Sequence, residues 1–328
     1  MYNFIKGGYI MKRSVRELSE REREEILELG MNKKRGQINL TWSEIADMYN
    51  LVDGEKVRGF INKYRQTIGD LKDYSAYTNE KVLVLSDFHI PYHDEEFILN
   101  TIRDNPSDTI IVAGDIIDGH CLSSFGLTET PDDLITEVIK AHELFTKIRE
   151  ITNAKIIVIH GNHSINRWLK IIAKRNLQCL NGLMVNPIDA ICNGFVTGVG
   201  KDRKIYGGIP DCEYVGKNSV IYRDVLIVHP DIYRKNTLAT VQALLKERVK
   251  WKYPHVRAVF AGHTHSLCLG IYQDILIGEA GCCCKAQDYA DNDGKLFSIT
   301  SLGAISFTLT NGAIDYNSTK IIYGGIPK

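Results

Sequence analysis

The segment IIVAGDIIDGH, residues 110–120, joins a short run of β-branched residues to a cluster of chemically active side chains. A run as short and apolar as Ile110–Ala113 predicts a buried β-strand. Four further runs of the same kind also end in aspartate, asparagine or histidine: Val82–Leu85, Ile156–Ile159, Val225–Val228 and Ala258–Ala261. Because the carboxyl ends of strands in an open α/β sheet meet at one edge, we expect these polar residues to converge.

The residues that follow the five runs are carboxylates, one amide and imidazoles. They are Asp87 and His89, Asp115 and Asp118, Asn162 and His163, His229, and His263 with His265. Residues two apart in an extended segment share a face, so the first pair and the last pair are each expected to project into one cavity. Gly114 lets the backbone approach metal ions closely. The arrangement predicts a two-metal hydrolytic site.

Composition limits the classes of protein that this chain can represent. Its 328 residues suffice for one large α/β domain and a smaller one, and 40 basic residues balance 40 acidic ones. No global field therefore demands nucleic acid, acidic lipid or an acidic substrate. No stretch reaches the roughly 18 apolar residues of a membrane span, and the opening residues lack a signal-peptide pattern. We expect a soluble, cytoplasmic protein with no membrane partner.

The eight cysteines are too sparse for a disulfide scaffold in a chain of this length. We expect them to be reduced thiols. The run Cys282–Cys284 follows the last histidine motif by one strand and a turn, so it is expected near the mouth of the site. No CxxC spacing indicates a zinc knuckle, and these three residues are interpreted as small hydrophobes in the core.

Residues 1–75 differ in texture from the rest and are predicted to form a small all-helical domain, with the α/β domain in residues 76–328. Ser14 and Glu17 have the spacing of a capping box at the start of a first helix. Gly30 is the expected end of that helix. The first helix is highly charged, which predicts that much of its surface is solvated.

A second capping box, Thr41 with Glu44, opens a short helix, and a more basic helix follows after a tight turn. The more basic helix carries Val57 and Ile61 inward at helical spacing. The pair resembles a helix-turn-helix DNA-binding unit. A protein-contacting or merely structural helical domain would show the same small basic excess, so both interpretations stay open. DNA is the partner that the first interpretation predicts.

From residue 81 onward, strands and helices alternate, which is typical of a layered α/β domain. Helices are predicted over residues 130–151, from His163 to Gly182, and over residues 236–250. The carboxyl-terminal part reads as all-β and includes an alternating run over Ile271–Ile277. Asn311-Gly312 predicts a hairpin turn.

Five sequence blocks in order resemble the signature of calcineurin-like metallophosphoesterases. The blocks are Asp87-x-His89, Gly114-Asp115-x-x-Asp118, Gly161-Asn162-His163, Val228-His229 and Gly262-His263-Thr264-His265. The resemblance implies a four-layer β-sandwich flanked by helices and a dinuclear centre. It assigns one ion to Asp87, His89 and His265, the other to Asn162, His229 and His263, and the bridging position to Asp115. It also implies that His163, oriented by Asp118, protonates the leaving oxygen or steadies the transition state.

The chemistry that such a centre supplies is hydrolysis of a phosphate ester. Two divalent ions lower the pKa of a shared water, and the resulting hydroxide attacks phosphorus in line. Mixed carboxylate and imidazole ligands favour manganese, with iron, zinc or nickel as alternatives. Asp118 is expected to raise the pKa of His163 and to fix its tautomer. Arg167, one helical turn after His163, either binds a phosphate oxygen or forms a surface salt bridge, and His120 either lines the cleft or is structural.

Departures from the family pattern narrow the substrate. Ser164 stands where many members have an acidic residue, and Gly119-His120 stands where phosphoprotein phosphatases carry arginine. These differences disfavour a protein phosphatase. The histidine at position 163 is similar to that of the recombination-repair nuclease branch and of other phosphodiesterases in the family, which implies phosphodiesters, in nucleic acid or a nucleotide, as the substrate. The competing interpretation is a DNA-binding regulator or adaptor with a vestigial phosphoesterase domain. The segment Gly281–Lys285 resembles a block in bacteriophage members, which would place the protein in the host cytoplasm.

Overall fold

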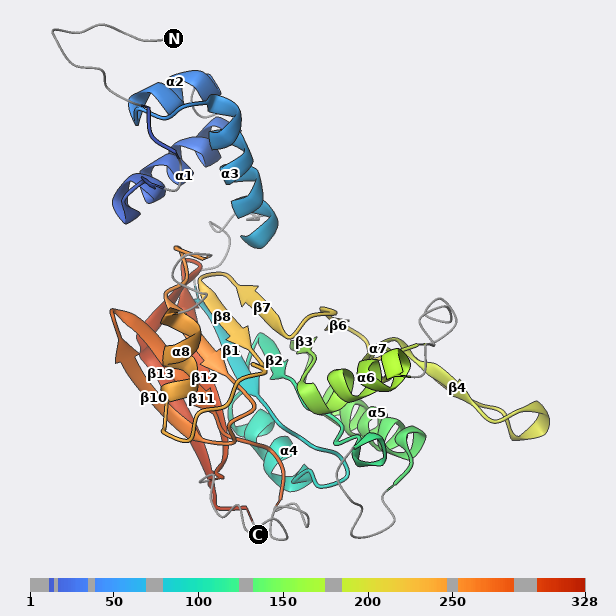
Figure 1. The fold of residues 1–328 in the computed structure, drawn as a ribbon. Helices are drawn as coiled ribbons and strands as arrows, with labels where there is room; N and C mark the ends of the chain where they lie inside the picture. The colour runs from blue at the N-terminus through green and yellow to red at the C-terminus, as the bar shows by residue number, and fades with distance from the viewer. Residues whose placement is uncertain are drawn as a thin grey trace, which may run out of the picture. The chain divides into compact units, whose positions relative to one another are not determined.

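The computed structural model describes most of the chain (Figure 1). The described residues are 12–14, 17–34, 39–68, 79–123, 132–174, 185–246, 253–285 and 300–327. The chain divides into two compact units, one of residues 1–73 with 248–255 and the other of residues 74–247 with 256–328. No described helix has the length and apolar character needed to cross a membrane.

The first unit contains three helices: α1 (Glu20–Lys34), α2 (Trp42–Met48) and α3 (Gly54–Ile68). Helix α1 begins after Ser19, whose hydroxyl accepts a hydrogen bond from the Glu22 amide (3.3 Å) while the Glu22 carboxylate accepts one from the Ser19 amide (2.9 Å). The capping box therefore lies five residues later than the sequence predicted, because Ser14 and Glu17 form a separate turn ahead of the helix.

Gly30 does not end α1, which continues to Lys34. A Cβ atom at Gly30 would lie 1.8 Å from Cδ1 of Ile61 on α3, so the glycine permits close packing of the two helices. The prediction of a stop at this position was wrong because packing, not termination, requires the missing side chain.

Helix α2 begins at the predicted capping box. The Thr41 hydroxyl accepts from the Glu44 amide (3.1 Å), and the Glu44 carboxylate accepts from the Thr41 amide (2.6 Å). Val57 and Ile61 are fully buried, as their helical spacing predicted. They belong to an apolar core shared by the three helices, whose buried members are Leu18, Ile26, Ile45, Ala46, Leu51, Val57 and Ile61.

The second unit is built on a six-stranded sheet in the order β13-β12-β1-β2-β3-β6. Its strands are β1 (Asn79–Leu85), β2 (Thr109–Ala113), β3 (Lys155–Ile159), β6 (Cys212–Tyr214), β12 (Leu302–Thr310) and β13 (Ala313–Gly325). Strands β1, β2, β3 and β6 are parallel to one another, and β12 and β13 are added antiparallel. The parallel strands direct their carboxyl ends to one edge of the sheet.

A five-stranded sheet in the order β10-β11-β9-β8-β7 faces the first. Its strands are β7 (Ser219–Tyr222), β8 (Val225–Val228), β9 (Ala258–Ala261), β10 (Leu267–Tyr272) and β11 (Ile275–Ala280). The prediction of a single run over Ile271–Ile277 was wrong, because Gln273 and Asp274 (φ 51° and 64°) turn the chain between β10 and β11. The predicted turn at Asn311-Gly312 is confirmed, with φ 52° and 80°.

Apolar residues on the inner faces of both sheets hold the sheets together. Val84 and Ile111 from the first sheet share a core with Ile227 and Phe260 from the second. The five predicted strands therefore lie in two facing sheets, three in one and two in the other, and not in a single open sheet. The expectation of a mixed α/β fold is confirmed.

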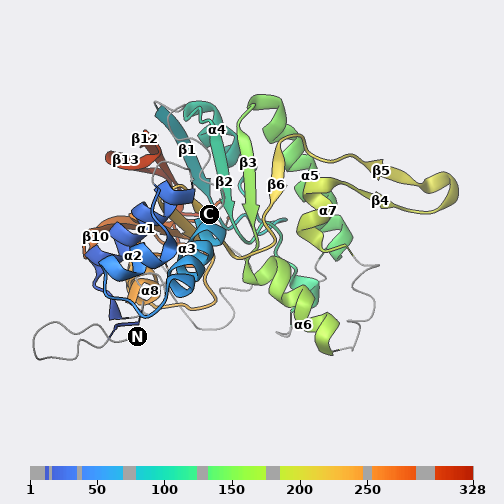
Figure 2. The same ribbon diagram turned by 90° about the horizontal axis from the view of Figure 1, so that it is seen from above.

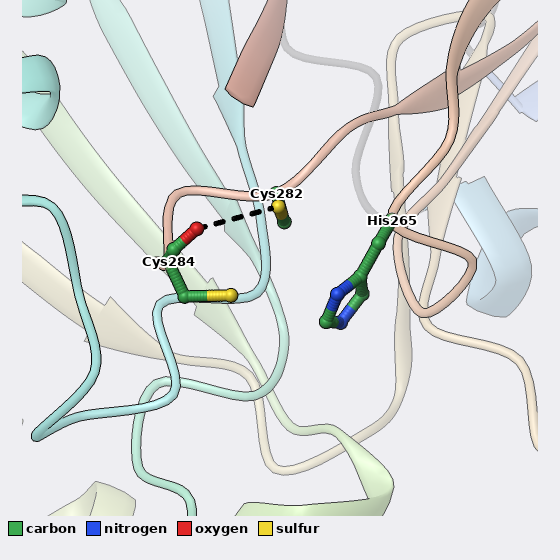
Figure 3. A group of neighbouring side chains, drawn as sticks. All are labelled: His265, Cys282 and Cys284. Carbon is green, nitrogen blue, oxygen red and sulfur yellow. Dashed lines mark hydrogen bonds between the residues drawn. The ribbon is translucent and has the colours of Figure 1, made fainter. Parts of the chain in front are cut away.

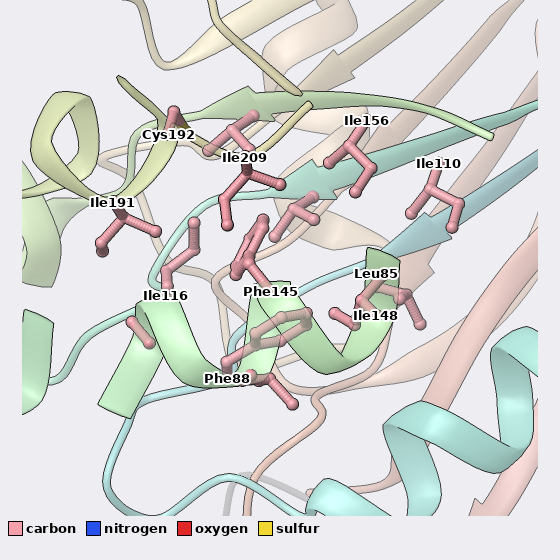
Figure 4. Packing of buried hydrophobic residues seen from close by; sticks show 14 of the residues in the cluster. Leu85, Phe88, Ile110, Ile116, Phe145, Ile148, Ile156, Ile191, Cys192 and Ile209 are labelled. Carbon is pink, nitrogen blue, oxygen red and sulfur yellow. The ribbon is translucent and has the colours of Figure 1, made fainter. Parts of the chain in front are cut away.

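Helices cover the outer faces of the two sheets. Helices α4 (Glu95–Asp104), α5 (Leu134–Ile151) and α7 (Pro187–Asn193) share a core with the six-stranded sheet, in which Phe145 packs among Ile110, Ile156 and other side chains (Figure 4). On the five-stranded sheet, α8 (Ala239–Leu244) contacts β9 and β11. A two-stranded hairpin, β4 (Phe195–Thr197) with β5 (Lys204–Tyr206), extends away from both sheets (Figure 2).

The three predicted helices of this unit are present with different bounds. Helix α5 ends at the predicted Ile151, although the predicted start near residue 130 lies outside the described residues. A π-helical turn, Asn162–Asn166, leads into α6 (Arg167–Lys174), and the predicted continuation to Gly182 lies outside the described residues. The third helix corresponds to α8, and residues 247–252 are again not described.

Candidate metal centre

Five of the expected ligands lie in left-handed turns just beyond the strand ends. Their φ values are positive: Asp87 55°, His89 47°, Asp115 44°, His263 76° and His265 55°. The prediction that the paired residues sit in extended segments was therefore wrong. Backbone hydrogen bonds hold the first turn against the second, from the Asp87 amide to the Gly114 carbonyl (3.2 Å) and from the His89 amide to the Asp115 carbonyl (2.9 Å). Non-glycine residues adopt this conformation rarely, and such turns concentrate at functional sites.

Asp87, His89 and His265 form the first group of side chains. Oδ1 of Asp87 lies 3.3 Å from Nε2 of His265 and 3.6 Å from Nε2 of His89, and the two Nε2 atoms are 3.2 Å apart. The other carboxylate oxygen of Asp87 accepts hydrogen bonds from the His263 amide (2.9 Å) and the Ser86 hydroxyl. The carboxylate is thus fixed on one side and faces two imidazoles on the other.

Asp115, Asn162, His229 and His263 form the second group. Nε2 of His229 lies 3.1 Å from Oδ2 of Asp115 and 2.9 Å from Oδ1 of Asn162, while its Nδ1 lies 2.8 Å from the Ala113 carbonyl. Donor atoms of Asp115, His229 and His263 all lie within 4.8 Å of one another. Oδ2 of Asp115 is also 3.8 Å from Nε2 of His89, so this carboxylate lies between the two groups.

The donor set fits divalent cations. Asp87 Oδ1 and Asp115 Oδ2 are buried, and among the described residues neither accepts a hydrogen bond of good geometry. Buried carboxylate oxygens without donors are costly unless a cation faces them. Gly114 has φ 90°, and a Cβ there would lie 2.4 Å from Nδ1 of His229, which agrees with the expected close approach of the backbone to the site.

Electrostatics around the two groups favour positive charge. Burial opposes ionisation of Asp87 and Asp115, yet the facing histidines hold the pKa of both carboxyls below the ordinary range. Burial likewise opposes charge on His89 and His229, but nearby aspartates raise the pKa of each to about 9. Burial lowers the pKa of His263 to about 4. The carboxylates therefore attract protons to two rings, and bound cations would supply that positive charge instead.

His163 lies beside the two groups and is held by Asp118. Its Nδ1 is 3.2 Å from Oδ1 of Asp118, an oxygen that also lies 2.9 Å from Nδ1 of His89. Burial lowers the pKa of His163 and outweighs the nearby carboxylates. Asp118 does act to raise this pKa, as expected, but the net shift is downward because the ring loses more hydration than the nearby carboxylates return in attraction.

Arg167 points back into the site from the first turn of α6. It donates to the Asp118 carbonyl from Nη1 (2.7 Å), and its Nη2 lies 3.3 Å from Nε2 of His163. Arg167 does form an ion pair, with Nη1 3.6 Å from Oδ2 of Asp118, but its side chain is only 15% exposed, so the expected surface location of the salt bridge was wrong. His120 is buried, and its Nδ1 lies 3.8 Å from Oδ2 of Asp118.

Glu137 on α5 is a buried residue that the sequence analysis missed. Its carboxylate accepts a hydrogen bond from the Gly119 amide (2.7 Å), directly after Asp118. Burial, together with the charge of Asp118, raises the pKa of Glu137 to about 8. A signal was present in the sequence, because Glu137 lies one helical turn before Ala141 and two before Leu144 on the apolar face of this helix.

Two facing sheets with clustered aspartates and histidines at their strand ends form a fold of the metallophosphoesterase type. A family model described as calcineurin-like phosphoesterase matches residues 80–267. The chain belongs to this family, and the resemblance seen in the sequence is confirmed. A search of curated proteins finds no match.

Solved structures that match this chain share little sequence with it. An archaeal phosphodiesterase is 16% identical, covers 74% of this chain and 99% of its own length, and has a TM-score of 0.34. A predicted phosphoesterase from Streptococcus pneumoniae TIGR4 is 12% identical with coverage of 76% and 99% and a TM-score of 0.29. Vacuolar protein sorting 29 from Cryptosporidium parvum is 12% identical with coverage of 76% and 100% and a TM-score of 0.36.

Proposed function

We propose that this protein is a dinuclear-metal-dependent phosphodiesterase. The observation that carries the proposal is a pair of buried oxygens, one of Asp87 and one of Asp115, which face imidazole nitrogens and accept no hydrogen bond within the described part of the chain. Asp87, His89 and His265 would hold one ion, and Asn162, His229 and His263 the other, with Asp115 bridging them. Carboxylate and imidazole ligands together suit manganese, with iron, zinc or nickel as alternatives.

When bound, the ions would activate a water molecule and neutralise the phosphoryl oxygens as charge builds on them. The protein contributes fixed positions. Asp87 is held on one side by the His263 amide, and Asp115 by the His163 amide (2.8 Å), so both carboxylates meet the site without rearrangement. Charged groups that are already in place stabilise the negative charge that develops in the transition state.

His163 is the proposed proton donor to the leaving oxygen. Its Nδ1 faces Asp118, which leaves Nε2 to face the substrate once Arg167 moves its guanidinium to a phosphate oxygen. The ring is neutral in the free site, and an arriving phosphate diester would favour its protonation by adding negative charge. A departing alkoxide needs such a proton, so the histidine suits esters with poor leaving groups, among them the diester linkage of DNA.

DNA is the proposed macromolecular substrate, recruited by the helical unit. Helices α2 and α3 are joined by a short turn, and Lys56 and Arg58 are exposed on α3. Two short helices with exposed basic residues on the second support a helix-turn-helix role for residues 1–75. Phosphate contacts by such residues would raise affinity without selecting a sequence.

The test uses the purified full chain with manganese, assayed on bis(4-nitrophenyl) phosphate, 4-nitrophenyl phosphate, and single- and double-stranded DNA. Asp87→Ala and His163→Ala are assayed in parallel. We expect turnover of the diester above the monoester, with a loss of about 10²–10⁴-fold in His163→Ala on esters with poor leaving groups. Absence of ester cleavage under every divalent metal would contradict the enzymatic proposal and leave a binding or adaptor role.

Recruitment is tested separately with Lys56→Glu/Arg58→Glu. We expect this variant to lose DNA retention and to keep turnover of the small diester. A charge-matched control is Lys201→Glu/Lys204→Glu, which changes exposed lysines in and beside β5. Equal loss of DNA binding in both variants would contradict the helix-turn-helix assignment.

A further inference from the structure

Two cysteines lie against the metal centre. The sulfur atoms of Cys282 and Cys284 and a ring nitrogen of His265 all lie within 4.8 Å of one another. Figure 3 shows the three side chains directed toward a common space, with the cysteines on the segment after β11 and His265 on the turn after β9. Both cysteines are buried, with 0% and 2% exposure.

The interpretation of Cys282–Cys284 as small hydrophobic residues is correct for the middle one, Cys283. Cys283 is fully buried in the apolar core beneath the six-stranded sheet, and its sulfur lies 3.8 Å from the Gly303 carbonyl. Cys282 and Cys284 differ because successive residues of the run point to opposite sides, so both sulfurs leave that core and face His265. Packing alone does not explain why two thiols and an imidazole meet at one point.

We propose that Cys282, Cys284 and His265 form a binding site for a thiophilic divalent cation such as zinc or cadmium. Two sulfurs and one imidazole nitrogen are a donor set that such ions prefer, and three protein ligands leave one tetrahedral position open. On binding, each thiol forms a metal–sulfur bond and releases one proton to solvent, so one divalent ion displaces two protons. The site has a ligand chemistry distinct from that of the dinuclear centre.

His265 joins this thiol site to the proposed dinuclear centre. The same ring lies 3.3 Å from Asp87 and 3.2 Å from His89 through Nε2. An ion at the two sulfurs would orient or withdraw this imidazole, so thiophilic metals would change the first group of ligands. Manganese, which prefers oxygen and nitrogen, would leave the thiols unoccupied.

The test adds cobalt(II) or cadmium(II) to the reduced full chain and follows sulfur-to-metal charge-transfer absorption in the ultraviolet. We expect the band in the wild type and its loss in Cys282→Ser and in Cys284→Ser, with cadmium affinity about 10–100-fold lower. Cys283→Ser is the matched control and should retain the band. Absence of the band in the wild type, or equal loss in all three variants, would overturn the proposal.

A second measurement needs no variant. X-ray absorption at the zinc edge of the zinc-loaded wild type should show sulfur neighbours at about 2.3 Å. A spectrum with nitrogen and oxygen neighbours alone would refute the site.

The variant Asp115→Asn separates this inference from the proposed function, because it should lose diester turnover and keep the charge-transfer band. A band in a chain without esterase activity would support the thiol site and contradict the enzymatic proposal.

Discussion

The two sheets contribute different chemistry to the candidate metal centre. The six-stranded sheet supplies all the carboxylates, Asp87, Asp115 and Asp118, from the ends of β1 and β2. The five-stranded sheet supplies histidines only, from the ends of β8 and β9. Neither sheet carries a complete ligand set, so cations at this site would bind the two sheets to each other. The carboxylates of the first sheet and the histidines of the second can therefore be removed separately by substitution.

The largest effect is expected from the acidic side. Asp115→Asn removes the charge between the two groups and should lower diester turnover on the order of 10³-fold or more, because several kcal/mol of charge stabilisation is lost. His229→Asn on the opposite sheet removes a neutral ligand and should cost about 10–100-fold, recoverable in part at high manganese concentration. Steady-state turnover across a manganese titration measures both. Equal, unrecoverable losses would break the distinction between the sheets.

Removal of metal should weaken the contact between the sheets. At a free manganese concentration about 100 times the dissociation constant, binding would stabilise the folded chain by about 2.7 kcal/mol, and a chelator should abolish that gain. Thermal unfolding with manganese, with chelator, and with Asp87→Ala provides the measurement. If the chelator lowers the midpoint of Asp87→Ala as much as that of the wild type, the stabilising metal lies elsewhere.

Backbone approach to the site should matter less than its charges. Gly114→Ala places a Cβ 2.4 Å from Nδ1 of His229 at φ 90°, and should lower manganese affinity about 10–100-fold by displacing that ring. Gly207→Ala is the control, because its Cβ would meet no atom within 4 Å. Isothermal titration with manganese compares the two. Unchanged affinity in Gly114→Ala would show that the ring can shift without cost.

The smallest effect is expected from Glu137, a buried carboxyl near Asp118 whose raised pKa favours its neutral form. Because the pKa of Glu137 is about 8 in the folded chain against an ordinary 4.5, its contribution to stability is full below pH 4.5 and is lost as pH rises through about 8. Glu137→Gln should therefore be more stable than the wild type by about 1–2 kcal/mol near pH 8, with little gain at pH 4.5. Urea unfolding across this range is the measurement, with exposed Glu143→Gln as control. A pH-independent difference would contradict the assignment.

Strand positions and the identity of the clustered residues could be predicted from the sequence, because short β-branched runs and the ordered blocks are local signals. The division of those strands between two sheets could not be derived from the runs themselves, since pairing of β3 with β6 or β8 with β9 is decided by distant segments. The β-sandwich was expected from the family resemblance and not from the periodicity of the apolar residues.

The backbone conformation and the protonation of the site residues were harder to predict than the identity of the residues that form the site. The prediction of an extended backbone at Asp87 and His89 was wrong because hydrogen bonds to the loop after β2 hold these residues in left-handed turns. The effect of Asp118 on the pKa of His163 could be predicted, but the net downward shift could not, because burial is a property of the whole fold and the sequence shows only the neighbouring charges. The position of Ser19 as the cap of α1 was missed because two serine-glutamate pairs have the same spacing.

The left-handed turns restrict which substitutions this chain can accumulate. Asparagine and aspartate tolerate positive φ better than other non-glycine residues, whereas valine, isoleucine and threonine do not. At Asp87 and Asp115 an exchange to asparagine would remove charge yet keep the turn, while a β-branched residue would disturb the loops that follow β1 and β2. Loss of metal binding without loss of fold is therefore open through a narrow set of replacements, and asparagine at these positions in a related chain would identify a domain that has kept its shape after losing its catalysis.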